Sequence, residues 1–194
     1  MSQNIEIEFK NIVTFDEFNK LKTFFQIVDS DFIIQENHYF DTPAFDLKKS
    51  GSALRIRNKN GKLEMTLKQP HPDGLLETNE TLNQLEADQL LQNGEINQGP
   101  IRKLIEKMNI NPELIQYFGS LRTNRAEKEY NGGLIVLDHS YYLNKEDFEI
   151  EYEVSNRKIG KKHFSELLEQ LQIPIRVTEN KIKRFYIEKY KQQC

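Results

Sequence analysis

Residues 52–69 read SALRIRNKNGKLEMTLKQ and contain two alternating runs joined by Asn60-Gly61. An Asn-Gly pair between alternating runs is the strongest short-range sign of a β-hairpin, because both turn positions need positive φ. Successive side chains of a strand point to opposite faces, so each run divides into an apolar and a charged face. The predicted hairpin therefore sets Leu54, Ile56, Leu63, Met65 and Leu67 against Arg55, Arg57, Lys62, Glu64, Thr66 and Lys68.

The same division into an apolar and a charged face recurs in two segments near the ends of the chain. Residues 4–10 alternate strictly and predict a strand, as do residues 148–155. On an ordinary half-buried strand the polar face is mixed, whereas here it is densely charged. The apolar sets are Ile5, Ile7 and Phe9, and Phe148, Ile150 and Tyr152; the charged sets are Glu6, Glu8 and Lys10, and Glu149, Glu151 and Glu153.

The rest of the chain carries a mixture of strand and helix patterns. Thr14, with Glu17 three residues on, predicts a capped helix over 15–26, and a Thr178/Asn180 cap predicts a C-terminal helix. Further strands are predicted at 31–42, 74–82, 119–130 and 134–142, with turns at Gly132-Gly133 and Asn144–Asp147. Further helical segments are one turn at Phe45–Lys49, a helix-rich region at 86–118 broken around Asn97–Pro100, and a helix at 161–171.

The two kinds of strand face predict how these elements pack. Helices with apolar stripes must be buried on a partner, and the apolar strand faces are the only large one available. This places the helices outside and the charged faces inside, and a barrel of about eight strands is wide enough for one small ligand. We therefore predict an α+β fold built on a closed antiparallel β-barrel with a charged tunnel. An open antiparallel sheet with solvated charged faces is the alternative.

Composition limits the partners and the compartment. A chain of 194 residues is expected to form one domain, residues 1–194. Its formal net charge of −3 gives no basic field for a nucleic acid polymer, and no apolar run is long enough to span a membrane. The single cysteine, Cys194, excludes an intrachain disulfide, and the acidic start MSQNIEIEFK is unlike a signal peptide. We expect a cytoplasmic protein.

The charged faces suit two kinds of ligand. Carboxylates two residues apart on a strand lie side by side and can share a hard cation such as Mg²⁺ or Mn²⁺. Two such pairs are present, Glu6 with Glu8 and Glu149 with Glu151. Arginine forks and lysine point charges suit phosphate oxygens, and the residues of this kind are Arg55, Arg57, Lys10 and Lys68. The histidines lack metal-binding spacing and are expected to be structural or surface residues: His38, His71, His139 and His163.

Short motifs follow one another along nearly the whole chain: E-x-E-x-K at 6–10, Y-F-D-T at 39–42, L-R-I-R at 54–57, T-L-K at 66–68, a strand with Arg125, L-D at 137–138, E-I-E at 149–151 and N-K-I-K-R at 180–184. In this order they resemble the CYTH domains of the triphosphate tunnel metalloenzymes, most of all the small single-domain bacterial branch. The resemblance implies an eight-stranded antiparallel tunnel with a C-terminal helix at one mouth. The strand after T-L-K departs from the family pattern because it lacks arginine, which leaves the roles of Glu77 and Glu80 open.

The resemblance also implies roles for individual residues. The implied metal ligands are Glu6, Glu8, Asp138, Glu149 and Glu151. The implied phosphate-binding residues are Lys10, Arg55, Arg57, Lys68, Arg125 and Lys181, the last on the C-terminal helix. The expected catalytic residues are Glu149, Glu151 and Lys68, with Glu77 and Glu153 as candidates for addition to these sets.

The expected activity is hydrolysis of an inorganic, organic or nucleoside triphosphate, with Mg²⁺ or Mn²⁺ as cofactor. Two alternatives remain. An adenylate cyclase would form cyclic AMP and pyrophosphate from ATP in the same tunnel, and a non-catalytic module would only bind polyphosphate or nucleotide. The partner in each case is a triphosphate small molecule, and the protein is expected to be a monomer or homodimer.

Overall fold

The computed structural model describes residues 1–191, so that Cys194 lies outside the described residues. Its eight strands form a closed antiparallel barrel in the order β1-β5-β4-β3-β2-β6-β7-β8, which confirms the predicted fold. The strands are β1 (Ser2–Val13), β2 (Ile33–Asp41), β3 (Ala53–Lys59), β4 (Lys62–His71), β5 (Gly74–Leu82), β6 (Gln116–Tyr130), β7 (Gly133–Tyr142) and β8 (Lys145–Val154). The chain divides into two compact units, residues 1–5 with 35–121 and residues 6–34 with 122–194, which we call unit 1 and unit 2.

The hairpin of β3 and β4 in unit 1 turns where the sequence predicts it. Asn60 and Gly61 have φ values of 53° and 76°, in the left-handed region that a two-residue hairpin turn requires. The register pairs Ile56 with Met65 and Arg55 with Thr66, so apolar and polar cross-strand pairs alternate along the hairpin. This register separates the two faces as predicted.

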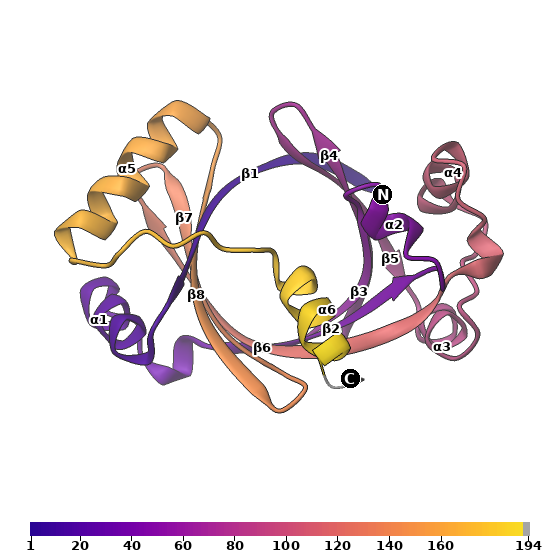
Figure 1. Cartoon of the computed structure of the whole chain (residues 1–194), viewed down its shortest axis with the longest axis horizontal. Coiled ribbons are helices and arrows are strands. Elements are labelled where there is room, and N and C mark those ends of the chain that lie inside the picture. Colours follow the sequence, from indigo (N-terminus) through magenta and orange to yellow (C-terminus); the bar gives the residue numbers. More distant parts are fainter. Residues whose placement is uncertain (192–194) are drawn as a thin grey trace. The chain divides into compact units, whose positions relative to one another are not determined.

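The apolar face of unit 1 is covered by helices α2 (Asp46–Lys49), α3 (Gln84–Asn93) and α4 (Pro100–Lys107). Figure 1 shows α3 and α4 beside β5. Leu54 and Ile56 of the hairpin are fully buried in one core with Ile101 and Ile105 of α4. Full burial of each such side chain contributes about 1.5–3 kcal/mol, so this packing decides which strand face meets the helices.

The helix-rich region predicted at 86–118 is shorter than expected. Helix α3 ends at Gly94, which adopts φ 71°, and a Cβ there would lie 1.8 Å from the Ile115 carbonyl oxygen. Helix α4 begins at Pro100 and ends before Asn109, a left-handed residue with φ 58°. After the short 3₁₀ turn η2 (Pro112–Leu114) the chain already enters β6 at Gln116, so residues 116–118 are strand.

Glu80, whose role the sequence left open, caps helix α4. Its register partner is Met65, which belongs to the helix-facing core of unit 1. The Glu80 carboxylate accepts the Ile101 backbone N–H at 2.5 Å, at the first turn of α4. A carboxylate at a helix N-terminus satisfies an unpaired N–H and complements the helix dipole. A Cβ on Gly99 would approach the Glu80 carboxylate to 2.7 Å, so a larger residue there would push this carboxylate aside.

The Y-F-D-T motif builds the turn into α2. Asp41 is buried, and its carboxylate accepts the backbone N–H groups of Thr42 at 2.8 Å, Leu47 at 2.9 Å and Lys48 at 3.1 Å. The Thr42 hydroxyl donates to Asp46 at 2.7 Å. These contacts close the single helical turn that the sequence predicts at Phe45–Lys49, and they give Asp41 a structural role.

Unit 2 packs helices α1 (Phe15–Phe25) and α5 (Arg157–Gln170) against the apolar face of β7 and β8 (Figure 1). Ile150 and Tyr152 of β8 are fully buried in one core with Leu21 of α1 and Leu167 of α5. The predicted capping box is confirmed, because the Thr14 side chain accepts the Glu17 N–H and Glu17 accepts the Thr14 N–H. No helix among residues 1–191 has the length and apolar character that crossing a membrane requires.

Several predicted boundaries in unit 2 are displaced. The turn after β6 is Asn131-Gly132 and not Gly132-Gly133, since these two residues have positive φ. The turn after β7 is likewise Leu143-Asn144, which puts the acidic residues of 144–147 largely on β8. Helix α5 starts at Arg157 and not at 161, because the Asn156 side chain accepts the Ile159 N–H and caps it.

An extended segment between α5 and helix α6 (Lys181–Lys191) lies against the end of β1, where the yellow trace crosses it in Figure 1. Asn11 is fully buried, accepts the Arg176 N–H at 2.6 Å and donates to the Pro174 carbonyl at 3.0 Å. Thr178 accepts the Ile12 N–H at 2.7 Å, so it does not cap α6 as predicted. The Asn11 side chain and the Ile12 backbone of β1 thus fix the chain that leads into α6.

Candidate active site

Three carboxylates gather on the face of β7 and β8 that points away from the helices of unit 2. Asp138 pairs in register with Glu149, and Glu151 is the next residue of β8 on the same face. Asp138 and Glu149 are fully buried, and Glu151 is 6% exposed. Because alternate residues of β8 enter the apolar core, the strand pleat forces these carboxylates onto the opposite face.

Lys181, the first residue of α6, lies among the three carboxylates. Its Nζ is 2.5 Å from Glu151 Oε1, 2.8 Å from Asp138 Oδ2 and 3.2 Å from Glu149 Oε2. The side chain of Lys181 is only 13% exposed. The resemblance placed Lys181 among the phosphate-binding residues, whereas the contacts place it directly on three implied metal ligands.

Two arginines complete the ion pairs of this cluster. Arg125 on β6 donates to Asp138 at 2.7 and 2.6 Å and to Glu151 at 2.8 Å. Arg184 donates to Asp147 at 2.9 Å and also pairs with Glu149. Sequence reasoning quoted Arg184 in the N-K-I-K-R motif but assigned it no role. Its position three residues after Lys181, on the same helix face, was the available indication.

The pKa shifts of the three carboxylates differ in direction. Burial alone would raise the pKa of Glu151, but Lys181, Arg125 and Lys10 outweigh it and hold that pKa well below its usual range. Arg125 and Lys181 likewise overcome burial and lower the pKa of Asp138. The pKa of Glu149 is raised, chiefly by burial. Burial would lower the pKa of Lys181, yet the surrounding carboxylates raise it well above its ordinary value.

The E-x-E-x-K motif stands beside this cluster on β1. Lys10 is in register with Glu151, and Glu8 is in register with Glu153. Lys10 and Glu8 form an ion pair with each other. Burial and the charges of Glu6, Glu151 and Glu8 raise the pKa of Glu153 to about 7, which places Glu153 in the same acidic surroundings.

The carboxylates of unit 2 have the donor chemistry of a divalent metal site. Oxygen ligands suit Mg²⁺ and Mn²⁺, and Glu149 Oε1 is buried without a hydrogen-bond partner among the described residues. Within residues 1–191, however, no set of three or more His, Cys, Asp or Glu side chains is spaced to hold an ion. The donors fit the metal by their chemistry, and enclosing an ion would require their side chains to regroup.

A basic group lies in unit 1, on the face of strands β3, β4 and β5 that points away from the helices of that unit. Lys68 Nζ is 2.6 Å from Glu77 Oε1, and Arg55 Nη2 is 3.8 Å from the same oxygen. Arg57 Nε donates to Asn37 Oδ1 at 3.2 Å. Burial would raise the pKa of Glu77, but Lys68 and Arg55 lower it to about 2, so Glu77 is the counter-ion of this group.

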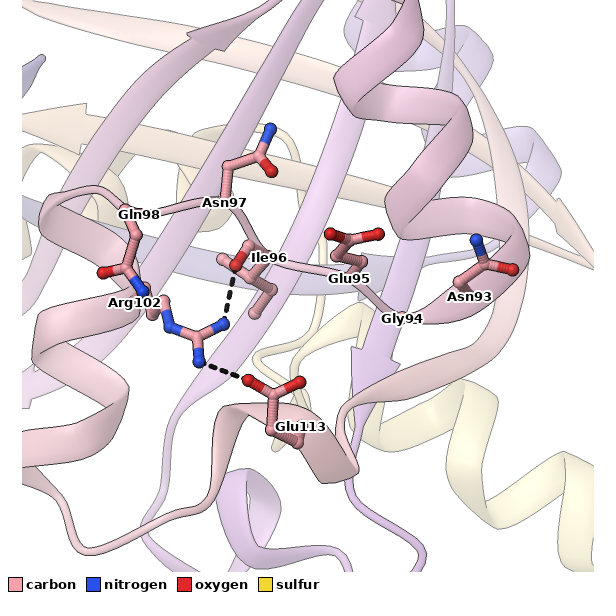
Figure 2. A pocket seen from close by; sticks show the side chains of 8 residues that line it. All are labelled: Asn93, Gly94, Glu95, Ile96, Asn97, Gln98, Arg102 and Glu113. Carbon is pink, nitrogen blue, oxygen red and sulfur yellow. Dashed lines mark hydrogen bonds and ion pairs between the residues drawn. The ribbon is translucent and has the colours of Figure 1, made fainter.

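A hollow of about 440 Å³ in unit 1 lies away from these strand faces, at the loop between α3 and α4. Figure 2 shows Arg102 pointing from α4 toward the Ile96 carbonyl and the Glu113 carboxylate. Arg102 donates to Ile96 at 2.8 Å and pairs with Glu113 and Glu106. The guanidinium in the hollow is thus already neutralised, and we assign the hollow a structural role.

The fold is a closed antiparallel barrel whose strands turn carboxylates and arginines away from the covering helices. Residues 4–186 match the model of the CYTH domain. The chain belongs to the CYTH domain family.

Individual relatives agree with this family. The chain is 52% identical over 191 residues to a Bacillus subtilis (strain 168) protein named "Putative triphosphatase YjbK", covering 98% of this chain and 99% of that protein. A Bacillus halodurans crystal structure called a "putative adenylate cyclase" is 43% identical with a TM-score of 0.93, over 96% and 100% of the chains. A Hippeastrum protein, called a "putative adenylyl cyclase" with a dominant triphosphatase activity, is 24% identical with a TM-score of 0.78, over 94% and 95% of the chains, and supports the fold alone.

Proposed function

We propose that this protein is a divalent-metal-dependent triphosphatase. The observation that carries the proposal is the cluster of buried carboxylates in unit 2, with an unpartnered oxygen on Glu149, in a barrel that also bears the Arg55, Arg57 and Lys68 group. The name of the Bacillus subtilis relative, at 52% identity, supports the same activity. The strand faces that carry these charges take no part in the hydrophobic core, so the cost of burying them calls for a functional explanation.

We assign the cation to one group of residues and the triphosphate to another. The proposed metal ligands are Glu6, Glu8, Asp138, Glu149 and Glu151, and the proposed phosphate-binding residues are Lys10, Arg55, Arg57, Lys68, Arg125 and Lys181. When bound, Mg²⁺ or Mn²⁺ would supply Lewis acidity at a phosphoryl oxygen and lower the pKa of a water.

The chain's own groups then have separate tasks. Arginine forks bind phosphate oxygens at two points and hold the terminal phosphorus in line for attack. Lys68 stabilises the negative charge that gathers on the departing diphosphate. Glu149 and Glu151 orient the attacking water and accept its proton, a role supported by the buried and unpartnered Oε1 of Glu149.

Product analysis tests this proposal against its rival. The Bacillus halodurans relative carries a cyclase name, and a cyclase would release pyrophosphate and cyclic AMP from ATP. Full-length protein should be assayed with tripolyphosphate, ATP and thiamine triphosphate, each with Mg²⁺ and with Mn²⁺. Orthophosphate that disappears with a chelator supports hydrolysis. Cyclic AMP with pyrophosphate would establish the cyclase instead, and tight triphosphate binding without any product would leave a binding module.

The proposal extends to the domain, the compartment, the oligomeric state and the partner of the protein. We take residues 1–194 to act as one CYTH-like domain, because a single family match extends from residue 4 to residue 186. We further propose a cytoplasmic protein, a monomer or homodimer, whose partner is a triphosphate small molecule and neither a nucleic acid polymer nor a membrane.

A further inference from the structure

The ammonium of Lys181 donates to Glu151 and forms ion pairs with all three carboxylates of the acidic cluster. An ammonium has three donors, and Nζ lies within 3.2 Å of one oxygen from each of Asp138, Glu149 and Glu151. These three residues are the proposed metal ligands of β7 and β8. A cation of the chain itself thus holds the oxygens that a divalent ion needs.

The charge of the cluster determines what it can accept. The ion pairs of Lys181, Arg125 and Arg184 join four carboxylates, those of Asp138, Asp147, Glu149 and Glu151, to three cations, which leaves one net negative charge. A divalent ion added beside Lys181 would bring a second cation onto the oxygens that the ammonium already contacts. A divalent ion that replaces Lys181 removes this competition, and within these ion pairs it balances the charge of the buried carboxylates.

We propose that Lys181 and the divalent metal are alternative occupants of the carboxylates of Asp138, Glu149 and Glu151, so that metal binds only when the lysine withdraws. The proposal rests on the proposed function only in taking these carboxylates as metal ligands. It explains how one residue can contact metal ligands and also serve a phosphate, because the displaced ammonium becomes available to the triphosphate.

The geometry allows Lys181 to withdraw while α6 stays in place. Arg184, one turn further along α6, donates to Asp147 at 2.9 and 3.2 Å and holds the helix to β8. Asn11 and Thr178 fix the preceding segment to β1. The exchange then needs rotation of the flexible lysine side chain, which has four methylene groups, and regrouping of carboxylates that also pair with Arg125 and Arg184.

Metal affinity measured without triphosphate tests the exchange. Full-length protein, stripped with a chelator, should be titrated with Mn²⁺ by calorimetry as wild type, as Lys181→Met and as Lys183→Met. Methionine keeps the length of the side chain and removes its charge; Lys183 is 51% exposed, pairs with Glu179 and serves as the control. If the lysine blocks the site most of the time, its removal should tighten Mn²⁺ binding about tenfold, with no change for Lys183→Met. Equal or weaker binding by Lys181→Met would overturn the proposal.

A second measurement on the wild-type protein does not depend on the variant folding. Lysine reactivity toward reductive methylation should be followed residue by residue by mass spectrometry, with and without Mn²⁺. The proposal predicts that Mn²⁺ increases methylation of Lys181 severalfold while Lys183 is unchanged. If Mn²⁺ binds and Lys181 stays as protected as before, the exchange is wrong and the proposed function is untouched. If no Mn²⁺ binds and no phosphate is released, the proposed function fails as well.

Discussion

Arg176 and Glu17 form a two-point ion pair across 159 residues of sequence. Nη1 donates to Oε2 and Nη2 to Oε1, each at 2.8 Å, and Nη1 also donates to the Ile12 carbonyl at 3.1 Å. Glu17 at the same time accepts the Thr14 N–H in the capping box of α1. One carboxylate therefore joins the start of α1 to the segment that carries α6.

This pair predicts a pH-dependent contribution to stability. The hydrogen bond from Arg176 lowers the pKa of Glu17 in the folded state. A carboxyl with a lowered folded pKa stabilises the fold above its unfolded pKa of about 4.3, and the contribution is lost as pH falls through the folded value. Glu17→Gln should cost about 1 kcal/mol at pH 7 in urea unfolding, and less below about pH 4. A difference from wild type that stays constant over this range would contradict the assignment.

Asn11 predicts a larger loss of stability. Asn11→Ala removes the acceptor of the Arg176 N–H and the donor to the Pro174 carbonyl in a fully buried position. Leaving buried backbone groups unpaired costs about 1–3 kcal/mol each, so we expect a loss of about 2–4 kcal/mol. Hydrogen exchange should also become faster in α6 than in α3. The exposed Asn93→Ala is the matched control, and equal effects of the two substitutions would disprove the role of Asn11.

Arg55 and Glu149 should separate binding from chemistry. Arg55→Ala removes a phosphate contact and should raise KM about tenfold or more, with a smaller change in kcat. Glu149→Ala removes a proposed metal ligand and should lower metal-dependent kcat to background. Steady-state kinetics on tripolyphosphate with Mn²⁺ measures both. Equal and small effects would mean that these charged faces take no part in the reaction.

Glu77 and Glu80 lie three residues apart and should behave differently. Glu77 pairs with Lys68 and Arg55, whereas Glu80 accepts the Ile101 N–H at the start of α4. Glu80→Ala should lower stability by about 1 kcal/mol and leave kcat/KM unchanged at a temperature where the variant is folded. Glu77→Gln should change kcat/KM severalfold. Thermal unfolding and kinetics on both variants check this, and a loss of kcat/KM in Glu80→Ala would contradict it.

The strand alternation predicted most of the fold because it is a local property. The faces of β3, β4 and β8 follow from the period of two, and the Asn60-Gly61 turn follows from its φ requirement. On β1 the pattern is less complete, because Ile5 of its predicted apolar face is 45% exposed. The same period puts Glu77 and Glu80 on opposite faces, since they lie three positions apart in one strand. Helix ends were less predictable. Gly94 and Asn109 adopt left-handed conformations at the ends of helices, and other glycines and asparagines in the sequence offered the same possibility.

The sequence proposed the candidate site as a set of residues but could not give the contacts among them. Glu149, Glu151 and Asp138 were proposed as metal ligands from their motifs, and their ion pairs with Lys181 join residues 30 or more positions apart. Thr178 was assigned to a helix cap that it does not form, because its true partner is Ile12 on β1. Such long-range partners leave no periodic pattern in the sequence.

Hydrolysis of ATP in water labelled with oxygen-18, with Mn²⁺ present, tests the central claim most directly. Attack by water on the terminal phosphorus predicts labelled orthophosphate, unlabelled ADP, and no product from the Glu149→Ala variant. Formation of cyclic AMP with unlabelled pyrophosphate, or absence of any product from ATP, tripolyphosphate and thiamine triphosphate, would contradict the assignment of this CYTH protein as a triphosphatase.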